Sequence, residues 1–448
     1  MDTAENNTRT SDSREILGLA VPAILTQVSL TVVEVVDTIF IGKLGPIPLA
    51  ASGLIMLIVW NVRMMAEGFG VGLTACIARM VGARDLRNAA LYFRTAIIGF
   101  AVLGILLVPV LRFTHNGLFR AMQMPEELFP ASRDYFSLFV LFIPFVYLVV
   151  AQQYGFRAAG DTLTPMLVGV GMNVVNLILD WVLIFGKFGL PAMGIRGAAF
   201  ASGISFVCGA GTLMLLSSKK PWGPFRKGPL FSLSHLVKVL RFGLPATVER
   251  MTMSISQIVV MALAVNPLGS FSVVGFQIVI RLASLSFMPG FGFSIAASTI
   301  AGQNLGAGKP KRGERLIWKS VLYAAGIFAA VAVLYFLIPD SLIRMFTSSK
   351  EIISISRRPL RLYAIMAVFL APTMVMGGGL RGAGDTRFPM IVMFLSRFFI
   401  RLPACWALSI QAGLGLFGVW IGMCLDFFIR SVVLTLKFRQ GKWKHIKV

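Results

Sequence analysis

Two stretches of the chain are near copies of each other and decide how it is organised: RAAGDTLTP at residues 157–165 and RGAGDTRFP at residues 381–389. The offset between them is 224 residues, from 157 to 381. The same offset relates Gly45 to Gly269, Gly82 to Gly306 and Gly194 to Gly418, and Pro22 has a counterpart in Pro245 at 223. Repeated agreement at one spacing indicates that the second half of the chain duplicates the first.

The composition around these motifs is that of a membrane protein. Of 448 residues, 56% are hydrophobic and 14% are charged, whereas a soluble domain carries about 25% charged residues. The net charge of +23 does not indicate a nucleic-acid partner, because the basic residues lie in short loops between apolar runs and not on one soluble face. The four cysteines lack the spacing of a metal site or a disulfide framework.

Twelve segments have the length of about 20 mainly apolar residues that a membrane span requires. They are residues 16–42, 50–77, 90–111, 135–156, 164–186, 194–216, 236–263, 271–300, 317–338, 360–380, 388–410 and 415–436. Because lipid cannot satisfy backbone polar groups, these spans are expected to be helices. The sequence therefore predicts an all-α polytopic membrane protein with twelve transmembrane helices in two pseudo-symmetric six-helix bundles.

The domain organisation follows from the duplication. We expect a disordered cytoplasmic tail at 1–15, an N-lobe at 16–217, a cytoplasmic linker at 218–235, a C-lobe at 236–437 and a basic tail at 438–448. Lys and Arg are concentrated in the loops on the side of both termini, which predicts that both termini are cytoplasmic in a cell membrane. Two copies with the same orientation are typical of transporters whose halves rock about an axis along the membrane normal.

Two aspartates in the first half are the principal candidate site. Asp37 and Asp180 each lie six or seven residues before the outer end of an outward-running span, about 10 Å inside the boundary at 1.5 Å per residue. Asn176 and Asn173 lie one and two turns deeper on the Asp180 face. Two facing carboxylates in a low-dielectric cavity need a proton or a cation between them, and oxygen ligands suit a hard ion such as Na⁺. The alternative is that each Asp pairs with an Arg.

Other intramembrane residues have less specific roles. Glu34 shares a helix face with Asp37 and either lines the same cavity or makes a plain polar contact. Asp426 and Arg430 are spaced for an ion pair. Flexible thioethers and aromatic rings suit promiscuous binding of flat cations, although the same side chains could face lipid. The possible cavity residues are Glu34, Met253, Gln257, Phe276 and Met288.

The duplicated loops are interpreted as structural hinges, with a gating role as the alternative. Gly160 and Gly384 are suited to ending one helix in a left-handed turn, and the aspartate that follows each glycine can cap the next helix. The residues assigned to these cytoplasmic loops are Arg157, Asp161, Arg381 and Asp385.

Together with two further motifs, these loops make the chain similar to the multidrug and toxic compound extrusion (MATE) family over nearly its whole length. The motifs are GQNLGAG at 302–308 and a first span in which Pro22 is followed by Asp37 and GKLG at 42–45. The resemblance implies two six-helix lobes and exchange of Na⁺ or H⁺ for cationic amphipathic organic compounds. It also favours the prokaryotic DinF-like branch, in which Asp37, Asn176 and Asp180 would match an N-lobe cation site.

The resemblance gives two further expectations. Pro22 matches the residue at which the first helix bends. Where the DinF-like branch has a threonine on the sixth helix, this chain has Ala198 and Ser202, a departure that favours H⁺ over Na⁺. Both coupling ions stay open, and no other metal is expected.

The predicted function is a secondary antiporter that exports cationic amphipathic compounds by alternating access. The alternatives are a flippase for lipid-linked saccharides or polyisoprenoid lipids and an uncoupled channel. An enzyme is not expected, because the spans hold no cluster of catalytic side chains. The 302–308 loop lacks the Lys-Ser/Thr ending of a nucleotide-binding loop, so no nucleotide is expected. We expect no cofactor beyond the coupling ion, and a monomer surrounded by lipid.

Overall fold

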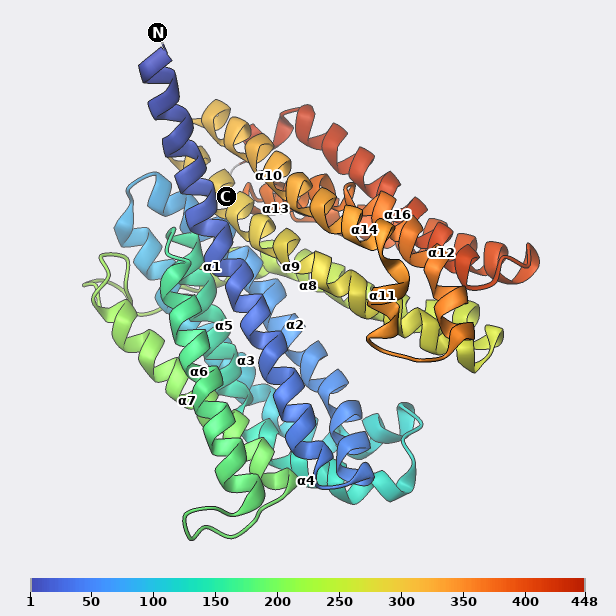
Figure 1. Cartoon of the computed structure of the whole chain (residues 1–448). Coiled ribbons are helices and arrows are strands. Elements are labelled where there is room, and N and C mark those ends of the chain that lie inside the picture. Colours follow the sequence, from blue (N-terminus) through green and yellow to red (C-terminus); the bar gives the residue numbers. More distant parts are fainter. Residues whose placement is uncertain (1, 447–448) are drawn as a thin grey trace. The chain divides into compact units, whose positions relative to one another are not determined.

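The structure is a computed structural model that describes residues 2–446, with side chains from Ser11 onward. All regular elements in that range are helices (Figure 1). The first half contains α1 (Asp2–Gly42), α2 (Pro46–Gly82), α3 (Leu86–Ala121), η1 (Glu126–Leu128), α4 (Phe129–Phe139), η2 (Val140–Phe142), α5 (Ile143–Ala158), α6 (Leu163–Phe185) and α7 (Ile195–Ser218).

The second half is more interrupted. It contains α8 (Leu233–Val260), η3 (Met261–Val265), η4 (Asn266–Leu268), α9 (Ser270–Gly306), α10 (Pro310–Leu337), α11 (Pro339–Arg344), α12 (Lys350–Ala367), α13 (Leu370–Gly382), α14 (Arg387–Leu395), η5 (Ser396–Arg401), α15 (Leu402–Trp406), η6 (Ala407–Gln411), α16 (Gly415–Arg439) and η7 (Lys442–His445). Three of these elements, η3, η5 and η6, are π-helical turns within longer helices.

The predicted membrane fold is confirmed. Within the described residues, eleven helices are long and apolar enough to cross a membrane, and α12 with α13 forms a further pair bent by 48°. The count is twelve if that pair is one span. The helices extend beyond the predicted apolar runs: the fourth span covers 126–158 and not only 135–156, because polar helical turns continue past the apolar segment.

The expectation of a disordered tail at 1–15 is wrong for the residues that the structure describes. Helix α1 begins at Asp2 and continues without a break into the first span. The buried carboxylate of Asp12 lies 2.7 Å from Lys319 Nζ, and Glu15 lies 2.5 Å from an Arg312 nitrogen on α10. These ion pairs hold the polar start of α1 in place, and hydropathy alone could not reveal them. The tail's side chains up to residue 10, and residues 447–448 of the basic tail, lie outside the described part.

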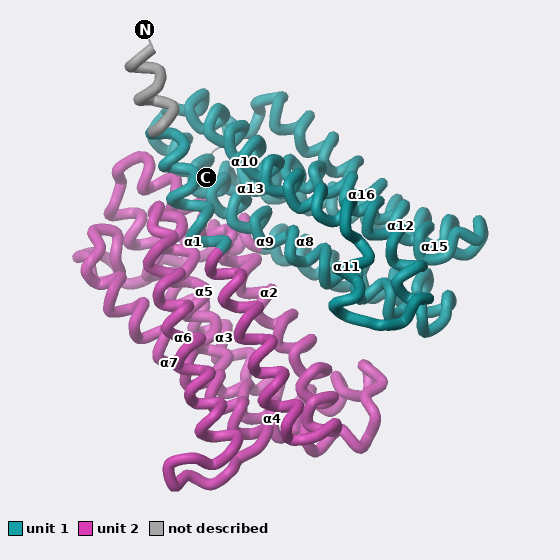
Figure 2. Tube along the Cα trace, in the orientation of Figure 1, with its two compact units in different colours: residues 1–24, 244–448 teal, residues 25–243 magenta. Residues whose placement is uncertain are grey.

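The chain divides into two compact units, residues 1–24 with 244–448 and residues 25–243 (Figure 2). The boundaries therefore lie inside α1 and α8, and differ from the predicted lobe limits 16–217 and 236–437. The start of each of these helices belongs to the unit that contains the other half of the chain.

Close helix contacts explain where the starts of α1 and α8 belong. A Cβ on Gly292 of α9 would lie 2.8 Å from the carbonyl oxygen of Ala20 in α1. Correspondingly, a Cβ on Gly72 of α2 would lie 2.3 Å from the carbonyl oxygen of Val239 in α8. Glycine at both positions permits the backbones to approach that closely.

Each unit has its own helix core. In the unit 25–243, α5 packs against α2, α3 and α7, and α6 packs along α7. In the other unit, α9 contacts α10, α12 and α13, and α16 contacts α12 and α13. Trp420 of α16 is fully buried and packs against the rings of Phe276 and Tyr363.

Candidate functional site

The structure brings Asp37 of α1 and Asp180 of α6 together within the unit 25–243. Their carboxyl groups lie within hydrogen-bonding reach of each other. Asp180 is 1% exposed, Asp37 is half-buried, and the Oδ1 atom of each is buried without a partner among the described side chains. In the described part, no lysine or arginine is ion-paired with either. Two such carboxyl groups cannot both stay charged unless a proton or a cation joins them.

Asn176 completes this cluster on the α6 side. Its Nδ2 donates to Asp180 Oδ2 at 3.0 Å and contacts Ser202 Oγ of α7 at 3.5 Å. The i, i+4 spacing of Asn176 and Asp180 places both on one helix face. The amide oxygen of Asn176 and the two carboxyl groups are the kind of donor set that a hard cation prefers.

Asn173, which was also expected at the coupling site, bonds a serine of α1. Its Nδ2 donates to Ser29 Oγ of α1 at 2.6 Å, so it connects the two helices below the carboxyl pair and does not contact the pair itself. Ser29 and Asn173 therefore fix the relative positions of α1 and α6, which carry Asp37 and Asp180.

Sequence reasoning missed Tyr135 of α4, which belongs to the same cluster. Tyr135 is 1% exposed, its hydroxyl bonds Ser202, and it lies within electrostatic reach of both Asp37 and Asp180. A signal existed: Tyr135 is the first residue of the predicted fourth span, which starts on the outer side of the membrane, the side nearer to the two aspartates.

Glu34 lies on the exposed side of α1 one turn from Asp37, and its charge acts on Asp37. The charge of Arg63 on α2 acts in turn on Glu34. Arg63 also donates to Glu67 at 3.1 Å in an i, i+4 pair. Glu34 is therefore a neighbour of the carboxyl pair and not a member of it.

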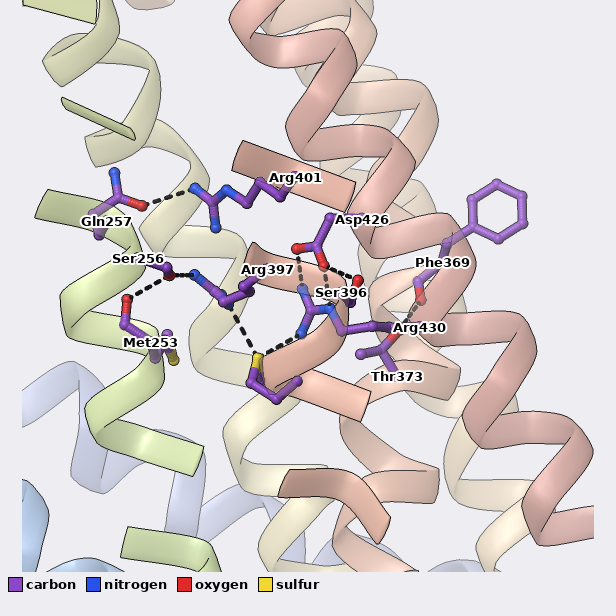
Figure 3. Close-up of polar contacts among 11 residues, drawn as sticks. Met253, Ser256, Gln257, Phe369, Thr373, Ser396, Arg397, Arg401, Asp426 and Arg430 are labelled. Atoms are coloured by element: carbon purple, nitrogen blue, oxygen red, sulfur yellow. Dashed lines mark hydrogen bonds and ion pairs between the residues drawn. The ribbon is translucent and has the colours of Figure 1, made fainter. Parts of the chain in front are cut away.

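The possible cavity residues of the second half do not form one group. Gln257 of α8 accepts from Arg401 Nη2 at 2.8 Å (Figure 3). Met253 is 40% exposed, Met288 is half-buried, and Phe276 is a core residue at 1% exposure. The side chain of Phe276 is occupied by packing against Trp420, at a ring distance of 5.9 Å.

The first duplicated loop holds two helices and the linker together. Gly160 has a φ of 92°, in the region that glycine tolerates. Asp161 accepts from the backbone N–H of Thr164 at 2.9 Å and from Lys220 Nζ at 3.0 Å. Partial burial raises the pKa of Asp161, but the hydrogen bonds from Thr164 and Lys220 outweigh it and leave the pKa below its usual value. Arg157 lies over the ring of Tyr154 at 5.5 Å.

The second loop repeats the backbone geometry with different side-chain partners. Gly384 has a φ of 97°, and Asp385 accepts from the backbone N–H of Phe388 at 3.3 Å. Arg381 is ion-paired with Glu249 of α8 at 2.8 Å and donates to Ser294 of α9 at 3.2 Å. Both loops thus have the contacts of structural connections.

Pro22 is a buried residue inside the continuous helix α1. Proline cannot donate a backbone hydrogen bond to the residue four positions earlier, and this weakens a helix locally. Gly292 of α9 lies directly against this part of α1, between Ala20 and Ile24.

A second buried polar cluster lies in the second half (Figure 3). Arg430 and Asp426 of α16 form the expected i, i+4 pair, with two hydrogen bonds of 2.8 and 2.9 Å. Arg397 and Arg401 of η5 do not hydrogen-bond this carboxylate and donate instead to Ser256 and Gln257 of α8.

Comparisons with known proteins agree with this architecture. The MatE family model matches twice, at residues 22–182 and 245–407, and the two matches begin at the paired prolines. The chain is 32% identical over 434 residues to the probable multidrug resistance protein NorM of Thermotoga maritima, covering 96% of this chain and 93% of the relative. It is 26% identical over 436 residues to the probable multidrug resistance protein YoeA of Bacillus subtilis, covering 95% and 92%.

Solved structures give the same fold. A MATE transporter of Vibrio cholerae superposes with a TM-score of 0.90 at 22% identity, covering 96% of this chain and 97% of the other. The preference for the DinF-like branch stays a prediction. The family itself is settled by the model that covers most of the chain: this protein belongs to the MatE family and is a multi-pass membrane transporter, not an enzyme.

Proposed function

We propose that the chain is a secondary antiporter that exports cationic amphipathic organic compounds in exchange for H⁺ or Na⁺. One observation supports it above the others: Asp37 and Asp180 are in contact, and each has a buried oxygen without a partner among the described residues. A pair of this kind must take up a cation or a proton when it is sealed from water, and release it when the surroundings change.

The carboxyl pair offers chemistry for either ion. A proton shared between Asp37 and Asp180 would leave a single negative charge on the pair. A Na⁺ ion would instead use the oxygens of Asp37 and Asp180 and the amide oxygen of Asn176, after Asn176 turned its amide away from Asp180. Ser202, in place of the threonine of the DinF-like branch, still provides a hydroxyl beside Asn176.

Antiport follows if the coupling ion and the drug compete for the same negative charge. The ionised pair attracts an organic cation, and uptake of H⁺ or Na⁺ removes that attraction, so the two are not carried together. Alternating access between an N-lobe and a C-lobe would then expose the pair to each side in turn. Relatives named as probable multidrug resistance proteins support the substrate class.

Ethidium efflux from proteoliposomes tests this proposal, with a pH gradient and a Na⁺ gradient imposed separately. We expect one of the two gradients to drive ethidium uphill, and to fail when Asp37 is changed to Asn. Ethidium flux that follows only its own gradient would contradict antiport and support the channel. No ethidium flux under either gradient, together with translocation of a lipid-linked saccharide, would support the flippase.

The cellular setting belongs to the same proposal. We infer a cell-membrane location with both termini cytoplasmic, because the basic loops 219–241 and 309–319 lie on the side of the termini. We also infer that the unit of function is a monomer surrounded by membrane lipids. Transport is driven by ion gradients and uses no nucleotide.

A further inference from the structure

The buried polar cluster in the second half contains more positive than negative charge. Arg397, Arg401 and Arg430 are 4%, 1% and 4% exposed, and Asp426 is fully buried. Arg430 uses two of its nitrogens on the two oxygens of Asp426, and Ser396 also donates to Asp426. The carboxylate is thereby paired with Arg430, and two guanidinium groups remain.

The direct partners of these two guanidinium groups are neutral. Arg397 donates to Ser256 Oγ at 2.9 Å and to the sulfur of Met393 at 3.0 Å. Arg401 donates to Gln257 Oε1 at 2.8 Å, and its side chain also bonds the neutral thiol of Cys405. Thioether sulfur is a weak acceptor, so the N–H group of Arg397 that faces Met393 lacks a strong partner.

Arg401 also has an unused donor. Its side chain is only 1% exposed, and its Nε is buried without a hydrogen-bond partner among the described residues. Arginine stays protonated in proteins, and the carboxylate whose charge reaches Arg401, that of Asp426, has its hydrogen bonds with Arg430 and Ser396 and not with Arg401. A buried guanidinium with an open N–H therefore indicates that an acceptor is missing from its surroundings.

The other acidic group whose charge reaches Arg397 is already engaged. Glu249 is the acidic residue of α8 and its charge reaches Arg397. Its carboxylate, however, bonds Arg381 at 2.8 Å. Among the described residues, Asp426 is the one carboxylate that hydrogen-bonds any of the three arginines Arg397, Arg401 and Arg430.

The backbone gives an independent indication of a site. Arg397 and Arg401 lie on the π-helical turn η5, and the π-helical turns η3 and η6 contact each other and lie against α15 and α16 nearby. Such turns are rare, cost helix stability and are frequent at functional sites. Figure 3 shows Arg397 and Arg401 between α8, with Ser256 and Gln257, and α16, with Asp426 and Arg430.

We propose that Arg397 and Arg401 form an anion-binding site in the second half of the chain, for a carboxylate or another oxyanion. The ligand is either a small free anion or the acidic group of an organic compound, since both present the same oxygens to a guanidinium fork. The site is separate from the Asp37–Asp180 pair, and it does not depend on the coupling ion assigned to that pair.

Binding to the purified wild-type protein in detergent is the first test. Acetate, phosphate and octanoate are titrated at constant ionic strength, balanced with sodium chloride, whose anion has no oxygen, with calorimetry and the thermal unfolding midpoint as readouts. We expect saturable binding and a saturable rise of the midpoint. Acetate and octanoate share a head group, so tighter binding of octanoate assigns the site to organic acids, whereas equal binding assigns it to small anions. If none of the three anions changed the thermal unfolding midpoint or gave a saturable heat of binding, the proposal would be wrong.

Variants locate the binding. Arg397→Gln and Arg401→Gln should each raise the dissociation constant about tenfold or more, as expected for loss of a hydrogen bond to a charged group. Arg281→Gln, at an exposed arginine of α9, should leave it unchanged. Arg401→Lys keeps the charge but loses the planar fork, so it should fold and still bind more weakly. If the anions bound Arg401→Lys and Arg397→Gln as tightly as the wild type, the cluster would be structural and the proposal wrong.

Discussion

Pro22 and Pro245 both lie beside a point at which a helix passes from one compact unit to the other. In α1 the boundary between the units follows Ile24, two residues after Pro22. In α8 it precedes Leu244, the residue before Pro245. Proline cannot donate a backbone hydrogen bond within the helix, so a helix bends more easily there. The duplicated chain thus has a proline-weakened helical turn at both points where the chain passes between its units.

The carboxyl pair gives the first prediction. Asp37→Asn and Asp180→Asn should each abolish gradient-driven ethidium efflux while the protein stays folded and inserted. An amide keeps the shape of the side chain but cannot exchange a proton or neutralise a cation. Efflux from proteoliposomes and the elution profile of the purified protein are measured on the same preparation.

Asp134→Asn is the matched control for these variants. Asp134 lies in the same half and its pair with Arg196 is largely exposed, so solvent screening leaves the pair little effect on stability and efflux should stay near the wild-type rate. Wild-type efflux in Asp37→Asn would rule out the coupling role.

The sequence was sufficient for much of this site. The outward direction of two spans and the equal depth of Asp37 and Asp180 predicted that they could meet, and the i, i+4 spacing placed Asn176 beside Asp180. The partner of Asn173 and the presence of Tyr135 could not be predicted, because they depend on the rotation of α1 and α4 against their neighbours. Hydropathy contains no information on that rotation.

The fold, too, could be predicted from the sequence only in part. The duplicated loops and twelve apolar runs predicted two similar halves, but not the exchange of the starts of α1 and α8 between units. That exchange depends on close contacts at single glycines, Gly72 and Gly292. The partners of Arg397 and Arg401 could not be predicted either, because the π-helical turn that carries them has no distinctive sequence pattern.

The second prediction concerns the stability of the buried pair. Asp426→Asn removes the one carboxylate bonded to Arg430 and leaves a charge uncompensated, so we expect a loss of about 3–5 kcal/mol in the free energy of unfolding. Arg430→Gln in the same background should restore part of it, because the uncompensated charge is removed. Denaturant unfolding of the single and double variants measures this coupling. If the double variant lost as much free energy of unfolding as the two single variants together, the two residues would not be coupled and the prediction would be wrong.

The third prediction is the orientation of the chain. A reporter enzyme that is active only outside the cell membrane, fused after Val448, should stay inactive. The same reporter inserted in the loop after Lys187, between α6 and α7, should be active, since that loop lies on the opposite side. Activity at the C-terminal fusion together with inactivity at the loop would invert the proposed topology.

The fourth prediction tests whether the proline turns convert charge into movement. Asp37 lies fifteen residues beyond Pro22 in α1, about 22 Å along the helix axis, so a modest bend at Pro22 displaces the carboxyl pair substantially. Uptake of one charge across 100 mV supplies about 2.3 kcal/mol, enough for a roughly fifty-fold change in population.

Pro22→Ala restores a backbone donor and stiffens this turn. It should leave ethidium binding near the wild-type affinity and slow turnover several-fold, with binding and transport measured on one preparation. Pro245→Ala is the matched variant, because the other crossing helix carries no member of the carboxyl pair. If only the α1 bend transmits the charge change, Pro245→Ala should slow turnover less than Pro22→Ala. Normal turnover in Pro22→Ala would mean that the unit 25–243 moves as a rigid body and that the bend has no part in transport.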